Sequence, residues 1–401
     1  MASSYTKPFK GIFYNKEKIG DIASCVCPPY DVISDSQVYY KRNLFNAIRL
    51  ELPDPEAGID KYINARLTFD EWLQSKVLLT DPTETIYIYE QEFVIGGVPH
   101  LRRGFIALNK LDKERILTHE QTRSKAKEDR EKLIASLKTF TSLVFGLYED
   151  RNFEIEEVLQ KSKKETLYDF IDEQHIKNRF YRMSDQKEIG RLTSLMDERK
   201  IYVADGHHRL DVSYRLNIPD IPVYLTNMYS EGVVILPYHR MITFETPRAL
   251  EQTLNLLQAH VEVQRIPLDG PQSAKRVLHI IASSYESAFG LYSTEDTGNV
   301  YIFSARLPRD GGPLERLKVN ILHSGLLKGV LGFKEEEISF TQDADELLQS
   351  VREKKVDLAF LLPPTTTKEV KEVADNGLYM PPKSTFFYPK ISTGLIYYKY
   401  A

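Results

Sequence analysis

The sequence has little cysteine: Cys25 and Cys27 are the only two among 401 residues. A spacing with one intervening residue suits neither a disulfide framework nor a structural zinc site. We therefore expect both side chains to be buried thiols of a protein that works in a reducing compartment.

Long apolar runs and an excess of positive charge are missing as well. No stretch approaches the ~20 apolar residues that a membrane-spanning helix needs, and no apolar run follows the lysines of residues 1–13 as in a signal peptide. The formal charge is −4, from 53 basic and 57 acidic residues, so no overall positive field attracts a nucleic-acid backbone. We expect a soluble, cytoplasmic protein without membrane or nucleic-acid partners, in which any site for an anion is local.

What the sequence does contain is typical of a folded, globular protein. Hydrophobic residues make up 42%, charged residues 27%, and there are 24 tyrosines, a composition that argues against disorder. Because the chain exceeds the size at which one hydrophobic core keeps growing, we expect two lobes. We place the boundary near Thr246-Pro247, so that residues 1–245 form the N-terminal lobe and 246–401 the C-terminal lobe.

Strand-like and helix-like segments alternate along both lobes. Two β-patterned runs separated by Gly96-Gly97 predict a hairpin, and a charged amphipathic segment predicts a helix at 124–138. The other segments that we expect to be regular are strands at 143–148, 180–183, 261–266 and 356–362, a helix at 250–260, and two strands flanking a turn at 296–298. This alternation predicts an α/β or α+β fold with mixed sheet layers in two lobes.

One junction between a strand-like and a helix-like segment carries an unusual group of polar residues. The strand-like run 200–204 is followed by Asp205-Gly206-His207-His208-Arg209, and then by the helix-like run 210–216. The first turn of a helix exposes backbone N–H groups with partial positive charge, and a glycine lets an anion approach them closely. We interpret this turn as the functional centre of the protein, suited to holding phosphate.

The side chains of the turn fit that interpretation. Arg209 could grip phosphate oxygens in a bidentate manner, and Asp205 could bind Mg²⁺ or accept a proton. His207 and His208 offer donors or a general base near neutral pH. The alternative is purely structural, with Asp205 capping the helix and the histidines satisfying neighbouring backbone groups.

Five ordered motifs resemble one family. They are Pro28-Pro29-Tyr30-Asp31-Val32-Ile33, His119-Glu120-Gln121-Thr122, Asp205 to Arg209, Pro237-Tyr238-His239-Arg240 and the segment from Met380 to Lys390. Together they resemble the bacterial and archaeal family of domains of unknown function numbered one thousand and fifteen, over nearly the whole chain. Two positions depart from the pattern: Tyr238 replaces a threonine, and Thr141-Ser142-Leu143 replaces Ser-Pro-Ile.

The turn alone is similar, over about ten residues, to the phosphate-binding Gly-x-x-Arg turn of the ParB and sulfiredoxin superfamily. That superfamily includes free-serine kinases, which move phosphate between a nucleotide and L-serine, and nucleotide-hydrolysing ParB proteins. The resemblance implies a ParB/sulfiredoxin-like strand-turn-helix at the site and a nucleotide as ligand.

Other candidates are weighed by the chemistry of their residue types. His119-Glu120 lacks the second histidine of a zinc protease motif because Arg123 stands at that position. Glu120 could still act as a base or magnesium ligand and Thr122 as a helix cap, with Lys125, Lys127 and Arg130 adding positive charge or forming only a solvated face. His239 and Arg240 follow an apolar run, and we expect them at or just past a strand end, where ligand sites gather. Lys383 could form a second contact to an anion, or its segment could serve only to close the fold. For Arg49 and Arg103 we expect surface or structural roles.

The leading hypothesis is a phosphotransferase that moves phosphate between ATP or ADP and a small hydroxylated metabolite, with serine or phosphoserine as the first acceptor to test. The alternatives are a non-catalytic, ParB-like regulator that binds a nucleotide, and a metal-dependent hydrolase that uses the scattered histidines. Candidate catalytic residues are Asp205, His207, His208 and Glu120, with Mg²⁺ held by Asp205 or Glu120. Candidate phosphate- or nucleotide-binding residues are Gly206, Arg209, His239, Arg240, His119, Thr122 and Lys383.

Overall fold

The chain divides into two compact units in a computed structural model, which describes residues 4–55, 58–121, 124–246, 248–268, 273–284, 287–305 and 311–401. Unit 1 comprises Met1–Val234 and Pro389–Ala401, and unit 2 comprises Ile235–Tyr388. Thr246, beside the expected boundary, falls inside unit 2, and Pro247 lies outside the described residues. The segment from Met380 to Lys390 is shared, since its last two residues belong to unit 1.

Unit 1 is built on a mixed sheet of nine strands within the described part of the chain. Eight of them follow the order β6 (Ile116–Leu117), β11 (Ile201–Asp205), β8 (Val144–Tyr148), β12 (Asp220–Asn227), β5 (Val98–Lys110), β4 (Ile86–Ile95), β10 (Lys177–Met183) and β9 (Lys164–Ile171), and β1 (Thr6–Lys7) pairs with β5. Strand β12 runs parallel to β8, whereas β11 runs antiparallel to it. The expected combination of mixed sheets and helices is confirmed.

The predicted hairpin is present as β4 and β5, which pair from Ile95↔Val98 onward. Its turn consists of Gly96 and Gly97, with φ angles of 60° and 87°. Positive φ at both central residues is the requirement of the hairpin turn whose twist matches that of the strands, and glycine meets it without steric cost.

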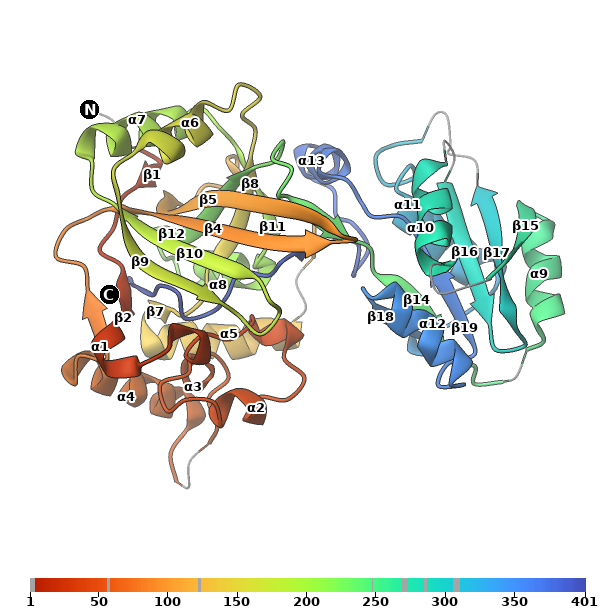
Figure 1. Ribbon diagram of the computed structural model, residues 1–401, viewed down its shortest axis with the longest axis horizontal. Coiled ribbons are helices and arrows are strands. Elements are labelled where there is room, and N and C mark those ends of the chain that lie inside the picture. Colours follow the sequence, from red (N-terminus) through yellow and green to blue (C-terminus); the bar gives the residue numbers. More distant parts are fainter. Residues whose placement is uncertain are drawn as a thin grey trace. The chain divides into compact units, whose positions relative to one another are not determined.

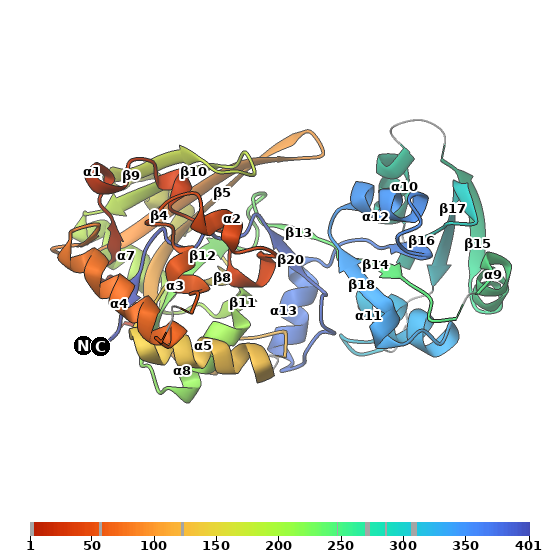
Figure 2. The same ribbon diagram turned by 90° about the horizontal axis from the view of Figure 1, so that it is seen from below.

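Helices cover both faces of this sheet (Figures 1 and 2). Helices α6 (Glu154–Lys161) and α7 (Gln186–Met196) lie on one side, and α4 (Lys61–Gln74) and α5 (Ser124–Leu137) lie on the other, where α5 contacts α8 (His207–Arg215). Apolar residues of α5, α6, α7 and α8 join those of the strands in one core, which includes Phe105, Val144, Ile155, Leu192 and Leu210. Removing this apolar surface from water stabilises the unit by roughly 25 cal/mol for each Å² buried.

The N-terminal segment of unit 1 forms short elements that pack beside these helices. They are β2 (Ile12–Tyr14), which pairs with β3 (Leu78–Thr80), the short helices α1 (Lys16–Ile19), α2 (Gln37–Tyr40) and α3 (Ile48–Glu51), and the 3-10 turns η1 (Ile22–Ser24) and η2 (Tyr30–Val32). Cys25 and Cys27 are buried and not disulfide-bonded, as predicted. The returning C-terminal segment adds β21 (Tyr398–Lys399), which pairs with β7 (Thr139–Phe140).

Unit 2 contains a second sheet of six strands within the described residues, in the order β15 (Glu262–Pro267), β17 (Asp296–Ala305), β16 (Ser287–Ser293), β19 (Leu358–Leu361), β14 (His239–Ile242) and β18 (Ile338–Thr341). Its helices are α9 (Leu250–Gln258), α10 (Ser273–Ser283), α11 (Lys318–Asn320), α12 (Ala344–Arg352) and α13 (Thr367–Asp375), with a π-helix η3 (Ile321–Val330) and a 3-10 turn η4 (Glu335–Glu337). A further pair joins β13 (Val234–Leu236) to β20 (Phe386–Tyr388).

Two local expectations about unit 2 are wrong. The turn expected at 296–298 lies earlier, because β16 ends at Ser293 and β17 begins at Asp296. His239 and Arg240 do not lie at the end of the strand formed by the apolar run; they are the first two residues of the next strand, β14, where β18 pairs with both and β19 pairs with Arg240. Pro237 and Tyr238 separate β13 from β14, so the apolar run and the His-Arg pair belong to different strands. Among the described helices, none has the length and hydropathy to cross a membrane.

Candidate functional site

The turn between β11 and α8 has the strand-turn-helix form that the sequence predicts. Gly206 joins the two elements with φ 92° and ψ 24°. A Cβ atom at this position would lie 3.0 Å from Nη2 of Arg209 and 3.2 Å from the Cα of Val144. Both the left-handed backbone and the crowding therefore require glycine, and the amide groups of the first turn of α8 follow directly after it.

Asp205, the last residue of β11, is held between two cations. Its Oδ2 accepts a hydrogen bond from Nη2 of Arg209 at 3.1 Å, and its Oδ1 accepts one from Nζ of Lys390. Burial by itself would raise the pKa of Asp205, but Lys390 and Arg209 outweigh it and lower that pKa to about 2. The carboxylate is therefore ionised throughout the neutral range, with both oxygens engaged.

Tyr30 and Asp31, from the Pro-Pro-Tyr-Asp motif, lie beside this group. Asp31 reaches solvent, but the protein around it displaces part of its water; this loss and the negative charge of Asp205 raise the pKa of Asp31, against the opposing effect of Lys390. Tyr30 is half-buried, and burial raises its pKa to about 12 although Arg209 and Arg130 act in the opposite direction. Two neighbouring carboxyl groups thus have pKa values shifted in opposite directions, which is the pattern of a paired acid and base.

The histidines of the two motifs meet on the other side of the turn. The rings of His119 and His207 stack edge to face with centroids 4.8 Å apart, and Nδ1 of His207 lies 3.9 Å from a carboxylate oxygen of Glu120. Burial lowers the pKa of His119 to about 3 and that of His207 to about 4, so both rings are neutral at pH 7. Burial also lowers the pKa of His208, although Glu120 opposes this shift.

His207 and Arg209 keep unused hydrogen-bonding capacity in this site. His207 is 7% exposed and Arg209 is 5% exposed. Within the described residues, Nε2 of His207 and Nε of Arg209 have no hydrogen-bond partner. A buried polar atom without a partner is costly, so these two atoms mark a place where a polar ligand would be stabilised.

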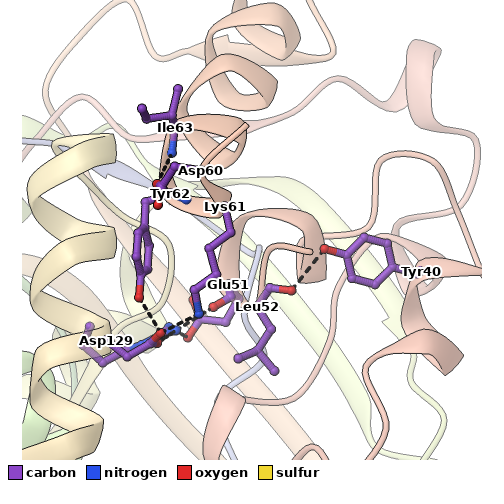
Figure 3. A network of polar contacts seen from close by, with 9 residues as sticks. Tyr40, Glu51, Leu52, Asp60, Lys61, Tyr62, Ile63 and Asp129 are labelled. Carbon is purple, nitrogen blue, oxygen red and sulfur yellow. Dashed lines mark hydrogen bonds and ion pairs between the residues drawn. The ribbon is translucent and has the colours of Figure 1, made fainter. Parts of the chain in front are cut away.

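A second polar network anchors the helices next to the turn (Figure 3). Glu51, at the end of α3, is fully buried; Nη1 of Arg130 lies 3.3 Å from its Oε1, which also accepts a hydrogen bond from Ser142 at 3.1 Å. Asp129 accepts hydrogen bonds from Nζ of Lys61 at 2.8 Å and from the hydroxyl of Tyr62 at 2.9 Å. This network joins α3, α4 and α5.

Arg130 connects the network to the candidate site. Its guanidinium lies 4.3 Å from the centre of the Tyr30 ring, and it also pairs with Asp129 at 2.6 Å. Arg130, expected to contribute positive charge to a ligand or to a solvated face, is instead buried and holds Tyr30 in place. Lys127 pairs with Asp211 at 3.1 Å, and nothing is described of the side chain of Lys125.

The predicted residues of the last two motifs lie in unit 2. Arg240 is fully buried on β14, donates from Nη2 to the carbonyl of Lys383 at 3.4 Å, and lies 4.9 Å from the centre of the Phe340 ring. Lys383 donates to the hydroxyl of Tyr238 at 3.4 Å, and Nδ1 of His239 accepts from the backbone of Leu362. His239, Arg240 and Lys383 therefore form a cluster of their own.

The remaining candidates have structural partners or lie outside the described residues. Arg49 donates to the carbonyl of Tyr40 at 3.1 Å, and Arg103 pairs with Glu90 at 2.6 Å, as expected of structural residues. Thr122 lies outside the described residues. No group of three or more histidine, cysteine or acidic side chains within the described part of the chain is placed to hold a metal ion.

Reasoning from the sequence missed the roles of Asp31, Lys390 and Glu51. A signal was present for two of them, because Asp31 belongs to the Pro-Pro-Tyr-Asp motif and Lys390 ends the Met380 segment. Their distance from Asp205 in sequence, however, hid the contact. Glu51 had no motif that could have indicated its place.

The fold and the site define a mixed α/β protein with a glycine-linked strand-turn-helix and a paired set of buried charges. The chain belongs to the DUF1015 family, described as a protein of unknown function, whose model matches residues 6–319. None of the curated protein sequences is significantly similar to it.

Among solved structures, the chain is similar to a free serine kinase in complex with AMP, with 16% identity, coverage of 72% of this chain and 92% of that chain, and a TM-score of 0.38. It is also similar to SbnI with C-terminal truncation from Staphylococcus aureus, with 12% identity, coverage of 71% and 85%, and a TM-score of 0.38. A conserved hypothetical protein from Pyrococcus furiosus has 16% identity, coverage of 72% and 95%, and a TM-score of 0.36. Likeness at this level carries no conclusion about activity.

Proposed function

We propose that the turn from Asp205 to Arg209 binds the phosphates of a nucleotide and that the protein transfers a phosphoryl group between that nucleotide and a small hydroxylated metabolite. One observation carries the proposal: Arg209 and Lys390 both contact Asp205 directly before the first turn of α8, with Asp31 of raised pKa beside them. Phosphoryl transfer depends mainly on positioning and charge neutralisation.

The charges of the site favour an anion. Arg209 and Lys390 both pair with the carboxylate of Asp205, so two cations meet at one carboxylate next to the turn. Nε of Arg209 and Nε2 of His207 remain as buried polar atoms for the ligand. A helix N-terminus preceded by glycine adds backbone donors for phosphate oxygens.

The two aspartates suit different roles. Asp205 is too acidic, with both oxygens engaged, to accept a proton from an alcohol, so we assign it to positioning Arg209 and Lys390. Asp31 reaches solvent and has a raised pKa, which suits a general base. In the forward step, Asp31 takes the hydroxyl proton, the acceptor oxygen bonds to the terminal phosphorus, and the bond from that phosphorus to the bridging oxygen breaks, releasing the shortened nucleotide.

Asp205 does not suit Mg²⁺, because its oxygens already accept from two cations. The carboxylate of Glu120, 37% exposed, is available, and Mg²⁺ in such sites is commonly held by one or two carboxylates together with phosphate oxygens. When bound, the ion would neutralise charge on the phosphates.

The acceptor that we would test first is serine, or phosphoserine for the reverse direction. This choice follows from the resemblance of the sequence from Asp205 to Arg209 to the corresponding turn of the free-serine kinases. The partly exposed Asp31 requires only that the acceptor bring a hydroxyl group to the rim of the turn.

The experiment measures nucleotide binding and phosphate exchange separately. Purified protein is incubated with Mg²⁺ and either ATP or ADP with serine, or AMP or ADP with phosphoserine, and the products are followed by ³¹P NMR. We expect Asp31→Asn to retain nucleotide binding and lose at least about 100-fold in turnover, as general-base variants do. Asp35→Asn, at another acidic residue of the same segment, is the matched control and keeps both activities.

Arg209→Lys is expected to weaken nucleotide binding about tenfold or more, because lysine cannot form the forked contact. If the wild-type protein binds nucleotide but turns over none of the acceptors, the protein is a nucleotide-binding regulator and not a phosphotransferase. If a folded Arg209→Lys protein binds nucleotide as tightly as the wild type, the turn from Asp205 to Arg209 is not the nucleotide site.

A further inference from the structure

Unit 1 contains a pocket of about 500 Å³ that the proposed function does not use. Three segments line it: 99–103 at the start of β5, 153–160 at the start of α6, and 229–231 after β12. The last segment packs closely on β5, since a Cβ at Gly232 would lie 2.2 Å from the carbonyl oxygen of Leu101. The volume of the pocket is typical of sites for small molecules.

This pocket and the turn at Asp205 lie at opposite ends of strand β8. Asp205 pairs with Phe145 near the first residue of that strand. Tyr148 is the last residue of β8, and α6, which carries Glu156 into the pocket lining, begins shortly after it. The pocket is therefore a separate site.

Glu156 is the unusual residue of the lining. It is 9% exposed, and neither carboxylate oxygen has a hydrogen-bond partner among the described residues. The backbone amide of Glu156 and the side-chain amide of Asn227 favour the ionised form, but burial outweighs them and raises the pKa of Glu156. The Asn227 amide also donates to the carbonyl of Asp150 at 2.7 Å. The hydroxyl of Tyr148, whose pKa burial and the charge of Glu156 raise, also has no partner among those residues. A buried carboxylate without a partner is costly, and a bound cation would remove the cost.

Arg103 supplies the opposite charge in the same pocket lining. Its Nε donates to Glu90 at 2.6 Å, and Glu90 also has Lys164 at 3.6 Å and Arg179 at 3.7 Å. Arg179 also pairs with Glu92 at 2.6 Å. Only Nε of Arg103 donates to Glu90, so its two terminal nitrogens are available to a ligand. Arg103 is close enough for its charge to affect Glu156, yet the described structure has no ion pair between them.

We infer that this pocket binds a small zwitterion of the α-amino acid class, with the ammonium group on Glu156 and the carboxylate on Arg103. Among the described residues, the pocket lining holds one carboxylate without a hydrogen-bond partner, Glu156, and one guanidinium that is bound through its Nε alone, Arg103, and these match the two ends of such a molecule. Phe153 and Tyr229, which are 43% and 37% exposed, lie along the lining and offer apolar contact for its side chain. This inference does not rest on the proposed phosphotransferase activity.

The test is calorimetric titration of the full chain with glycine, L-alanine and L-serine, and with ethylamine and propionate as ligands of one charge. We expect at least one amino acid to bind, and each single-charge analogue to bind about tenfold more weakly or worse, since it loses one charged contact. Absence of amino-acid binding at about 10 mM, a concentration that detects even weak association, would overturn the inference.

Three variants locate the ligand. Glu156→Gln keeps the shape of the side chain and should reduce amino-acid affinity at least about tenfold. Glu157→Gln, at the next residue and also in the lining but paired with Lys161, should leave affinity unchanged. Arg103→Lys keeps a cation beside Glu90. It should weaken the binding of the amino acid and leave the affinity for ethylamine unchanged.

Wild-type affinity in Glu156→Gln, or equal losses in Glu156→Gln and Glu157→Gln, would overturn the assignment. Ethylamine binding as tightly as alanine would equally overturn it, because Arg103 would then contribute nothing. Thermal unfolding of each variant shows that the proteins compared are folded.

Discussion

Two acidic residues at opposite ends of strand β8 have very different surroundings, Asp205 being half-buried and Glu156 buried. Asp205 lies between Arg209 and Lys390, and its pKa falls to about 2. Glu156 has no partner within the described residues, and burial raises its pKa. Both carboxylates thus lose contact with water at a cost in free energy, but only at Asp205 does charge pairing offset this cost. The difference teaches that a buried charge with its partners present builds the site, whereas one without partners points to a molecule that is still to bind.

Glu51 extends this comparison as the most completely satisfied of the buried acids. It is fully buried, forms an ion pair with Arg130, and accepts hydrogen bonds from the hydroxyls of Thr141 and Ser142. Thr141 and Ser142, which belong to the tripeptide that departs from the family pattern, are therefore the hydroxyl donors to this carboxylate. Four predictions test whether pairing decides the contribution of each buried group.

The largest effect is expected for Glu51→Gln. Removing the charge leaves Arg130 paired only with the partly exposed Asp129 and takes away its fully buried partner. Breaking a buried ion pair costs about 3–5 kcal/mol of the free energy of unfolding. Urea denaturation at pH 7 measures it. Glu128→Gln, at an exposed position of α5, is the control and should change stability by less than about 0.5 kcal/mol. A similar small change in Glu51→Gln would contradict the ranking.

The next effect concerns acidification and His207. Burial lowers its pKa to about 4, so the unfolded chain takes up a proton near pH 6.5 before the folded protein does. Stability is therefore present above pH 6.5 and is lost as pH falls toward 4. The contribution of this histidine is on the order of 3 kcal/mol. Denaturation midpoints between pH 7 and 4.5 should fall less steeply in His207→Gln; an identical slope would mean that the ring is not buried in its neutral form.

A smaller loss of stability is expected for Asp205→Asn, and it depends on pH in a more acidic range. The pKa of Asp205 is depressed, so its stabilising effect is present above the unfolded pKa near 4 and is lost as pH falls toward 2. We expect a deficit of about 2 kcal/mol at pH 7 that disappears by about pH 2. Asp211→Asn, at the surface of α8, is the comparison variant. A deficit that persists at pH 2 would indicate lost packing instead of lost charge.

The smallest effect has the opposite sign. Because the pKa of Glu156 is raised, its ionised form destabilises the folded protein at neutral pH, and this penalty is absent below the unfolded pKa. Glu156→Gln should therefore raise the free energy of unfolding by about 1 kcal/mol at pH 7.5 and leave it unchanged near pH 4. Thermal unfolding at both pH values measures it, with Glu157→Gln as control. Destabilisation at pH 7.5 would show that Glu156 has a protein partner.

Much of the local structure could be predicted from sequence because the signals are local. Gly96-Gly97 determines the hairpin turn, and the change from strand-like to helix-like spacing around Gly206 determines the strand-turn-helix. His239 and Arg240 show the limit of such signals. The apolar run before them indicated a strand end, but two residues further the chain entered a new strand whose burial is set by its neighbours β18 and β19.

The candidate site was predictable only in its central turn. The sequence by itself determined that Gly206 must link a strand to a helix there and that Asp205, His207 and Arg209 must stand within one turn of it, because spacing along the chain and backbone geometry decide both. Only the tertiary structure decided that Lys390 and Asp31 join Asp205 while Glu156 remains alone, because a carboxylate acquires its pKa and its partners from groups that folding brings together from distant parts of the chain.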